Sequence, residues 1–175
     1  MGIRFKLVDD TKGIAAHIPQ LRRYARALTG DHTAAEDLVQ DTLERAWKRF
    51  SLWRSGSNLR AWLFTIMHNI FINQVRTEPH KQNQNAEHSA VHLSGSWTAE
   101  DRLELEDLGK ALRRLPNEQR EVILLIGLEQ MSYDEAAKVL GIPIGTVMSR
   151  LSRGREQLRA IMNGTSGTSQ LKVVR

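Results

Sequence analysis

The chain has no cysteine among its 175 residues, which excludes disulfide bonds and thiolate metal sites. No apolar run approaches the roughly 20 residues that a helix needs to span a bilayer. The first residues, MGIRFKLVDDTKG, lack the apolar segment of a secretory signal peptide. We therefore expect a cytoplasmic protein with no membrane insertion of its own.

Motifs for catalysis are also missing. We find no glycine-rich phosphate loop, no nucleophile elbow and no paired carboxylates in surroundings that would shift a pKa. His80, His88 and His92 could each bind a metal, but they lie in a polar segment without cysteine or a carboxylate cluster, where histidines are more often solvated. We expect a protein that is not an enzyme, with no catalytic residue, no cofactor and no metal site.

The alternation of apolar and polar residues that is typical of strands is absent at useful length, so we predict an all-α fold. A polar segment rich in Asn, Gln, Ser and His separates two parts with helical patterns. We predict two small helical domains, residues 12–78 and 99–163, with a flexible linker at 79–98 and a flexible tail at 164–175. The formal net charge of +5 suits a polyanionic partner without deciding for one.

The most informative stretch is SYDEAAKVLGIPIGTVMSRLSRGREQLRAI, which begins at Ser132. Ser132 and Glu135 form a capping box, which predicts a short helix from Tyr133. Gly141 can adopt the positive φ that ends a helix, and Pro143 favours the start of the next one. The pattern predicts a helix-turn-helix within a C-terminal domain of four helices.

The second helix of this pair has two distinct sides. Its inward side is predicted to be the stripe Val147, Leu151, Gly154, Leu158 and Ile161, spaced by four, three, four and three residues. An adjoining face without large aliphatic groups carries Thr146, Ser149, Arg150 and Arg153. Arginine can read guanine in the major groove, whereas Arg155 and Arg159 point elsewhere, more toward phosphates. A solvated basic face is the alternative, but the capped, glycine-turned helix pair favours DNA binding.

Two further helices are predicted to support this motif. A leucine-rich helix spans Leu103 to Leu115 and ends before Pro116, and Asn117 is expected to cap the next helix. That next helix contains the run EVILLIGL, which is too apolar for a surface helix. Four helices can bury a core that a lone pair of helices could not.

The N-terminal part begins with a basic amphipathic helix, Ile18 to Leu28, that ends at Gly30. A second capping box, Thr33 and Glu36, predicts a helix to about Phe50. The expected core stripe of this second helix is Val39, Leu43, Ala46, Trp47 and Phe50, and its acidic face is Asp37, Asp41 and Glu44. Periodicity alone favours a solvated acidic surface, supported by pairs such as Asp41 with Arg45, over a docking face for a basic protein.

A third N-terminal helix is predicted from Asn58 to Val75, with a core stripe of Trp62, Leu63, Ile66 and Ile70. Asn69 and Asn73 lie one turn apart, with His68 and Arg76 nearby. Asn side chains can read exposed base edges, and aromatic rings such as Phe64 and Phe71 can stack on unpaired bases. For most of these aromatic side chains a place in the core is the favoured interpretation.

Together, the DLVQDTLERAWKR helix, the NLRAWLFTIMHNIFIN segment, LPNEQREVILL and SYDEAAKVLGIPIGTVMSRLSRGR resemble an extracytoplasmic-function (group IV) sigma factor of bacterial RNA polymerase. The resemblance covers about residues 14 to 162. It is specific, because several motifs occur in the order of the family, whereas a helix-turn-helix alone is shared by many regulators. It implies a promoter-specificity subunit that binds core RNA polymerase and promoter DNA and is held inactive by an anti-sigma factor.

The resemblance also implies roles for individual residues. It reverses the preference for a solvated acidic face, because the matching helix in the family binds the clamp of the largest polymerase subunit; the candidates are Asp37, Gln40, Asp41 and Arg45. Candidates for reading the −35 element as duplex are Thr146, Met148, Ser149, Arg150, Ser152, Arg153 and Arg155. Candidates for capturing the melted −10 strand are Asn58, Leu59, Asn69, Asn73 and Arg76.

Two other functions remain open. A stand-alone helix-turn-helix regulator would bind duplex DNA without polymerase. A sigma mimic would sequester an anti-sigma factor and would not need a basic reading face. The sigma interpretation is geometrically feasible, because a fully extended linker of twenty residues spans about 65 Å, close to two turns of DNA at roughly 34 Å each.

Overall fold

The computed structural model describes the backbone of residues 2–53, 57–77 and 98–169. Every regular element in these ranges is helical, which confirms the predicted all-α class. Most of the proposed linker, with His80, His88 and His92, lies outside the described residues. The elements are α1 (Gly2–Thr29), α2 (His32–Arg49), the 3₁₀ turn η1 (Phe50–Leu52), α3 (Leu59–Thr77), α4 (Ala99–Arg113), α5 (Asn117–Ile123), the π-helical turn η3 (Leu124–Leu128), α6 (Tyr133–Leu140) and α7 (Ile144–Ser169).

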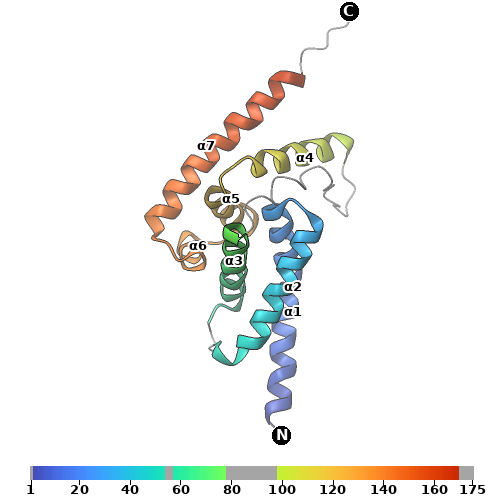
Figure 1. Cartoon of the computed structure of the whole chain (residues 1–175), viewed down its shortest axis with the longest axis vertical. Coiled ribbons are helices and arrows are strands. Elements are labelled where there is room, and N and C mark those ends of the chain that lie inside the picture. Colours follow the sequence, from blue (N-terminus) through green and yellow to red (C-terminus); the bar gives the residue numbers. More distant parts are fainter. Residues whose placement is uncertain (1, 54–56, 78–97, 170–175) are drawn as a thin grey trace, which may run out of the picture.

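The helices form a layered bundle around α3 (Figure 1). α1 and α2 lie side by side, and α3 lies between this pair and α6, with direct contacts on both sides. α7 packs against α4, α5 and α6 and extends past them as a long outer helix. It continues to Ser169, into the segment predicted as a tail. No helix in the described part of the chain is long and apolar enough to cross a membrane.

The turn between α1 and α2 differs from the expected one. Gly30 ends α1 with φ of +72°, and the extended Asp31 then accepts a hydrogen bond of 2.7 Å from the backbone N–H three residues later. The predicted capping box of Thr33 and Glu36 is therefore wrong, because α2 has already begun and Thr33 lies in its first turn. Asp is as good an N-cap as Thr, and the glycine turn sets the extended backbone that an N-cap requires directly after it.

The buried side of α2 is also rotated from the predicted one. Trp47 was expected in the core, but it is 53% exposed, and Leu43 and Phe50 are only half-buried. α2 packs between α1 and α3, and both neighbours meet a face centred about one residue earlier on the helix. The side chains on that buried face are Ala35, Leu38, Val39, Thr42 and Ala46.

The start of α5 needs a similar correction. Asn117 was predicted as the N-cap, but it is the first helical residue, and Pro116 occupies the cap position without a side-chain hydrogen bond. The Pro116 carbonyl accepts the N–H of Arg120 at 3.0 Å, which closes the first turn one residue earlier than expected. The apolar run that follows is buried as predicted, at Val122, Leu124 and Leu125.

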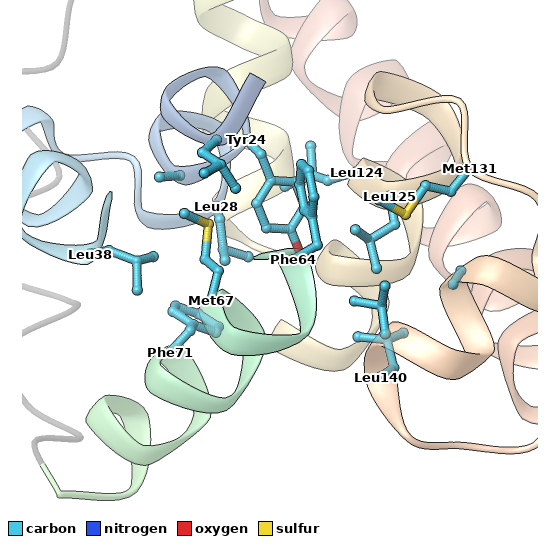
Figure 2. Close-up of a cluster of buried hydrophobic side chains, with 14 of the residues drawn as sticks. Tyr24, Leu28, Leu38, Phe64, Met67, Phe71, Leu124, Leu125, Met131 and Leu140 are labelled. Carbon is cyan, nitrogen blue, oxygen red and sulfur yellow. The ribbon is translucent and has the colours of Figure 1, made fainter. Parts of the chain in front are cut away.

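One hydrophobic core runs through both predicted domains (Figure 2). Tyr24 of α1 and Phe64 of α3 meet edge to face, with ring centroids 5.1 Å apart. Figure 2 shows these rings facing Leu124 and Leu125 of η3 across the boundary between the two parts. The edge-to-face pair adds about 0.5–1.5 kcal/mol beyond the area it buries. The two sequence-defined parts are therefore packed together as one body in this structure.

Close packing of α5 on α7 depends on Gly154. A Cβ at this position would lie 2.8 Å from Ile123 Cδ1 and 3.2 Å from Gln119 Cβ. We expect Gly154→Leu to lower the free energy of unfolding by about 1–3 kcal/mol in urea denaturation, because the two helices must separate. Gly164→Leu on the same helix is the control, since nothing lies within 4 Å of its Cβ position, and it should be neutral or stabilising. Equal effects of the two substitutions would contradict this packing role.

Candidate nucleic-acid interface

The helix-turn-helix forms as the sequence predicts. Ser132 and Glu135 make both bonds of the capping box, α6 starts at Tyr133, and Gly141 ends it in the left-handed conformation with φ of +63°. Pro143 precedes the first residue of α7, and its carbonyl accepts the first backbone bonds of that helix. The two helices are therefore fixed by local backbone chemistry.

The orientation of α7 is the one that its apolar stripe predicts, with the stripe facing the core. Val147, Leu151 and Gly154 are buried, and Leu158 and Ile161 are half-buried. On the other side of α7, the exposed candidates are Met148, Ser149, Ser152, Arg153 and Arg155, whereas Thr146 and Arg150 are half-buried. The exposed side carries residue types that can contact base edges in a major groove.

Two arginines of this face are held in place by neighbours. Arg150 Nη2 lies 2.8 Å from Glu118 Oε2 of α5, and the Arg150 side chain is only 23% exposed. Arg153 donates from Nε to the Ser149 carbonyl at 3.2 Å, one turn back along α7. Such contacts restrict side-chain rotamers before DNA binds, which reduces the entropy lost on recognition.

The candidate polymerase-binding residues share one open side of α2. Asp37, Gln40, Asp41 and Arg45 are all exposed. The ion pair recorded along this helix joins Glu44 and Lys48, rather than the Asp41 and Arg45 pair suggested by the sequence. Asp37 and Asp41 therefore present their carboxylates to solvent, as a docking surface for a basic partner requires.

Glu36, next to this surface, instead ties α2 to α1. Its carboxylate lies 3.0 Å from Arg22 Nε and 3.1 Å from Arg26 Nη2. Slight burial opposes ionisation of Glu36, but the hydrogen bonds and charges of Arg26 and Arg22 outweigh it and lower its pKa. Glu36 thus serves the α1–α2 contact and is not a free docking residue.

The candidate strand-capturing residues lie along α3. Asn58 caps the helix, because its Oδ1 accepts the Ala61 N–H at 3.0 Å, and its Nδ2 donates to Glu135 Oε1 of α6 at 2.8 Å. Leu59 is half-buried, and the exposed members of the set are Asn58, Asn69, Asn73 and Arg76. The neighbouring Ser55 and Gly56 lie outside the described residues.

The aromatic side chains of α3 belong mainly to the core. Phe64 is 1% exposed and Phe71 is fully buried, which confirms the favoured interpretation for both rings. Trp62 is half-buried and meets Phe50 edge to face at 6.2 Å. In this arrangement the two phenylalanine rings cannot stack on a base.

Sequence reasoning missed a buried ionic contact centred on Glu129. The Glu129 side chain has no exposed surface, yet its Oε1 accepts from Arg23 Nε and Nη2 of α1 at 3.1 and 3.0 Å. Its Oε2 accepts from Arg60 Nη2 of α3 at 3.2 Å. A buried carboxylate is tolerated only when it is paired and hydrogen-bonded. The signal in the sequence was an acidic residue closing an otherwise apolar run.

A second missed group lies one helix earlier. Glu121 is 2% exposed, and its Oε1 lies 2.5 Å from Nδ1 of His68 in α3. Burial raises the pKa of Tyr24, and the negative charges of Glu121 and Glu129 raise it further. Both carboxylates therefore face the boundary at which α1 and α3 meet α5 and η3.

Arg120 completes this boundary without a carboxylate partner. Its guanidinium donates to the carbonyls of Leu28 at 2.8 Å, Leu112 at 3.0 Å, Arg113 at 2.9 Å and Leu115 at 3.0 Å. Burial lowers the pKa of Arg120, as does the nearby charge of Arg113, while Glu121 acts in the opposite direction. These bonds satisfy carbonyls at the ends of both α1 and α4, which helices otherwise leave without partners.

The described part of the chain is all-helical, and its helix-turn-helix presents an exposed basic face, as DNA-binding proteins of the transcription apparatus do. Two family models match it: the Sigma2 domain of PhyR at residues 14–68 and Sigma-70, region 4 at residues 105–158. The sigma factor EcfG of Rhodopseudomonas palustris is 39% identical over 163 residues, which cover 93% of this chain and 88% of the relative. The chain therefore belongs to the extracytoplasmic-function (ECF) RNA polymerase sigma factors.

Solved structures agree with this assignment. The sigma factor RpoE of Bartonella quintana, in complex with the anti-sigma factor NepR, is 39% identical with a TM-score of 0.75, covering 89% of this chain and 97% of that one. CnrH, in complex with the cytosolic domain of CnrY, is 30% identical with a TM-score of 0.66, covering 89% and 88%. PhyRSL of Sphingomonas sp. Fr1, at 21% identity and a TM-score of 0.66, covering 93% and 91%, shares the fold alone.

Proposed function

We propose that this chain is an alternative sigma factor that binds core RNA polymerase in the cytoplasm and directs initiation at a specific set of promoters. In this proposal residues 12–78 bind polymerase and the −10 element, residues 79–98 are the linker, and residues 99–163 bind the −35 element. The chain has no catalytic role of its own. Family membership over nearly the whole chain supports the general function.

The observation that carries the proposal is the exposed face of α7. Its buried side is fixed by Val147 and Leu151, so Ser149 and Arg153 must face outward. A recognition helix reads base edges with such outward residues near its start. We assign duplex reading of the −35 element to Thr146, Met148, Ser149, Arg150, Ser152, Arg153 and Arg155.

Two further surfaces complete the proposed mechanism. On α2, Asp37, Gln40, Asp41 and Arg45 would contact the clamp of the largest polymerase subunit. On α3, Asn58, Leu59, Asn69, Asn73 and Arg76 would hold the melted −10 strand. An extruded base costs a few kcal/mol of stacking and pairing, so strand capture benefits from an upstream anchor that keeps the complex in register.

An anti-sigma factor is the proposed inhibitory partner. RpoE and CnrH, which are 39% and 30% identical to this chain, are each solved with such a partner. We propose that an inhibitor of this kind covers the polymerase-binding and DNA-binding faces until a signal releases it. A pull-down with candidate inhibitors encoded near this gene provides the test.

A sigma mimic is the second candidate, and one observation favours it: the N-terminal family model is the Sigma2 domain of PhyR. PhyR of Bartonella quintana is described as an anti-anti-sigma factor, but it is only 20% identical to this chain, compared with 39% for the sigma factor RpoE. The exposed arginines of α7 also favour promoter binding. A stand-alone regulator has no comparable support from the relatives.

In vitro transcription separates these functions. Purified chain and core polymerase should give specific transcripts from a subset of genomic promoter fragments, whereas core polymerase alone should not. A mimic would bind an anti-sigma factor but give no transcript, and a stand-alone regulator would bind duplex DNA equally well without polymerase. Failure of the folded, inhibitor-free chain to direct initiation from any fragment would refute the sigma proposal.

Base reading by α7 can be tested with single substitutions. We expect Arg150→Ala or Arg153→Ala to weaken binding to the −35 element by about 1–3 kcal/mol and to relax specificity at one base pair, if the contact is bidentate. Arg159→Ala is the control. Arg159 lies off the reading face, so its substitution should weaken binding to all DNA sequences equally. Binding should be measured on matched and mismatched duplexes at several salt concentrations. If Arg150→Ala or Arg153→Ala lowers the affinity equally for all DNA sequences, the arginine contacts a phosphate instead of a base.

A further inference from the structure

The two parts of the chain are joined by a polar lock, which we define as the buried Glu129 with Arg23 and Arg60. Glu129 comes from the C-terminal part, where it ends η3, whereas Arg23 and Arg60 belong to α1 and α3. Arg23 Nη2 also donates to the Leu128 carbonyl at 3.2 Å, and Arg60 to the carbonyl of Glu129 itself. A single buried carboxylate thus holds two N-terminal helices against the C-terminal part.

Other contacts across the same boundary surround the lock. Arg120 of α5 donates to the Leu28 carbonyl at the end of α1, and His68 of α3 pairs with Glu121 of α5. Close approach at Gly30 is part of the same boundary, because a Cβ there would lie 2.4 Å from Arg113 Cδ. These contacts join charged and polar groups of the two parts directly.

This arrangement holds together the two parts of the chain that are proposed to read separate promoter elements. α3 carries the proposed −10 residues and packs directly on α6 of the helix-turn-helix. Asn58, a proposed strand-capturing residue, donates to Glu135 of α6 at 2.8 Å and is occupied by that contact. The two elements lie about two turns of DNA apart, at roughly 34 Å per turn. One chain can reach both only after α3 and α6 separate.

We propose that the free sigma factor is self-inhibited: the Glu129 lock holds it closed, and promoter capture requires the lock to open. This inference rests on the proposed function and adds a regulatory step to it. The α2 surface with Asp37 and Asp41 stays exposed in the closed form, so core polymerase can dock first and opening follows. RpoE, solved in complex with the anti-sigma factor NepR, matches 89% of this chain with a TM-score of 0.75.

The lock can be weakened by substitutions that leave the apolar side chains of the core unchanged. Glu129→Gln preserves shape but removes the charge that Arg23 and Arg60 share. Arg23→Gln is a milder variant, because the Arg23 side chain is 53% exposed and can lose its charge without leaving a cavity. Arg22→Gln is its matched control: the adjacent residue, 52% exposed, pairs with Glu36 inside the N-terminal part and does not touch the lock.

A distance measurement on the intact chain tests the closed state directly. Because the chain has no cysteine, Ser51→Cys on η1 and Glu156→Cys on α7, both at exposed positions, can be labelled with a fluorophore pair. We expect a predominantly short distance in the parent chain and in Arg22→Gln, with no more than about one-tenth of the molecules at a longer distance. Glu129→Gln and Arg23→Gln should add a population longer by on the order of 20 Å, the scale of a relaxed linker. A broad, long distribution already present in the parent chain would overturn the proposal.

In vitro transcription with limiting sigma factor then tests whether the lock inhibits. Glu129→Gln and Arg23→Gln should give faster open-complex formation than the parent, by about tenfold if the competent state is one-tenth populated in the parent. Equal rates for opened and closed chains would overturn the inhibitory role even if the distances change as expected. Absence of transcripts from every variant, together with the expected distances, would reject the sigma function while retaining the lock. Thermal melting of each variant tests whether a loss of transcription comes from unfolding of the chain.

Discussion

Arg120→Met should lower the free energy of unfolding by about 3–5 kcal/mol. This is the largest stability effect that we expect from a single substitution that keeps the side-chain volume similar. Methionine fills similar space but leaves the carbonyls of Leu28, Leu112, Arg113 and Leu115 without their donor. Each buried polar group without a partner costs about 1–3 kcal/mol, and small shifts that admit water recover part of the sum. Urea denaturation followed by circular dichroism measures the change.

Arg114→Met is the matched control for this result. Arg114 lies six residues earlier, is exposed, and caps α4 through its backbone rather than its side chain. Its substitution should change stability by less than about 0.5 kcal/mol. A loss below about 1 kcal/mol for Arg120→Met would mean that water replaces the guanidinium, and that α1 and α4 do not depend on this shared cap.

Asp41→Arg should weaken binding to core polymerase by at least about a hundredfold. Asp41 is exposed on α2, so the substitution does not disturb the core, but it reverses one charge at the centre of the proposed clamp contact. Like charges across an interface cost several kcal/mol, and about 2.7 kcal/mol corresponds to a hundredfold change. Fluorescence anisotropy with labelled sigma factor and core enzyme measures the affinity.

Glu104→Arg supplies the control for charge alone. Glu104 is an exposed acidic residue of α4, away from the α2 surface, and its reversal changes net charge by the same amount. Core affinity should change less than about threefold for this control, since screened charges at a distance contribute little. Both variants should keep duplex binding by the helix-turn-helix. Unchanged core affinity for Asp41→Arg would show that the acidic face of α2 is merely solvated.

Most of the fold and the exposed face of α7 could be predicted from sequence because they depend on neighbours within one or two turns. The capping box of Ser132, the left-handed Gly141 and the stripe that includes Val147 and Leu151 each involve residues only a few positions apart. Local errors arose where two residues could serve equally well. Asp31 rather than Thr33 caps α2, and Pro116 rather than Asn117 precedes α5, because the preceding turn decides which residue has extended backbone.

Errors in burial had a different origin. Trp47 fits the helical period of the predicted stripe nearly as well as the residues that are buried, and its size favoured the core. Its 53% exposure follows from where α1 and α3 meet α2, which the sequence of α2 does not contain. The contact of Asn58 with Glu135, 77 positions away, likewise depends on tertiary packing, and the proposed role of Asn58 in holding DNA stays a prediction.

By itself, therefore, the sequence determined the helical class, the capping box of α6, the basic face of α7 and the acidic face of α2, since each follows from short-range backbone bonding and side-chain period. The tertiary structure decided that the two parts share one core and that Glu129 meets Arg23, 106 positions away. An acidic residue at the end of an apolar run indicates that a basic partner exists, but the sequence does not identify that partner. Only the three-dimensional path of the chain brings the two charges together, because their separation in sequence carries no local constraint.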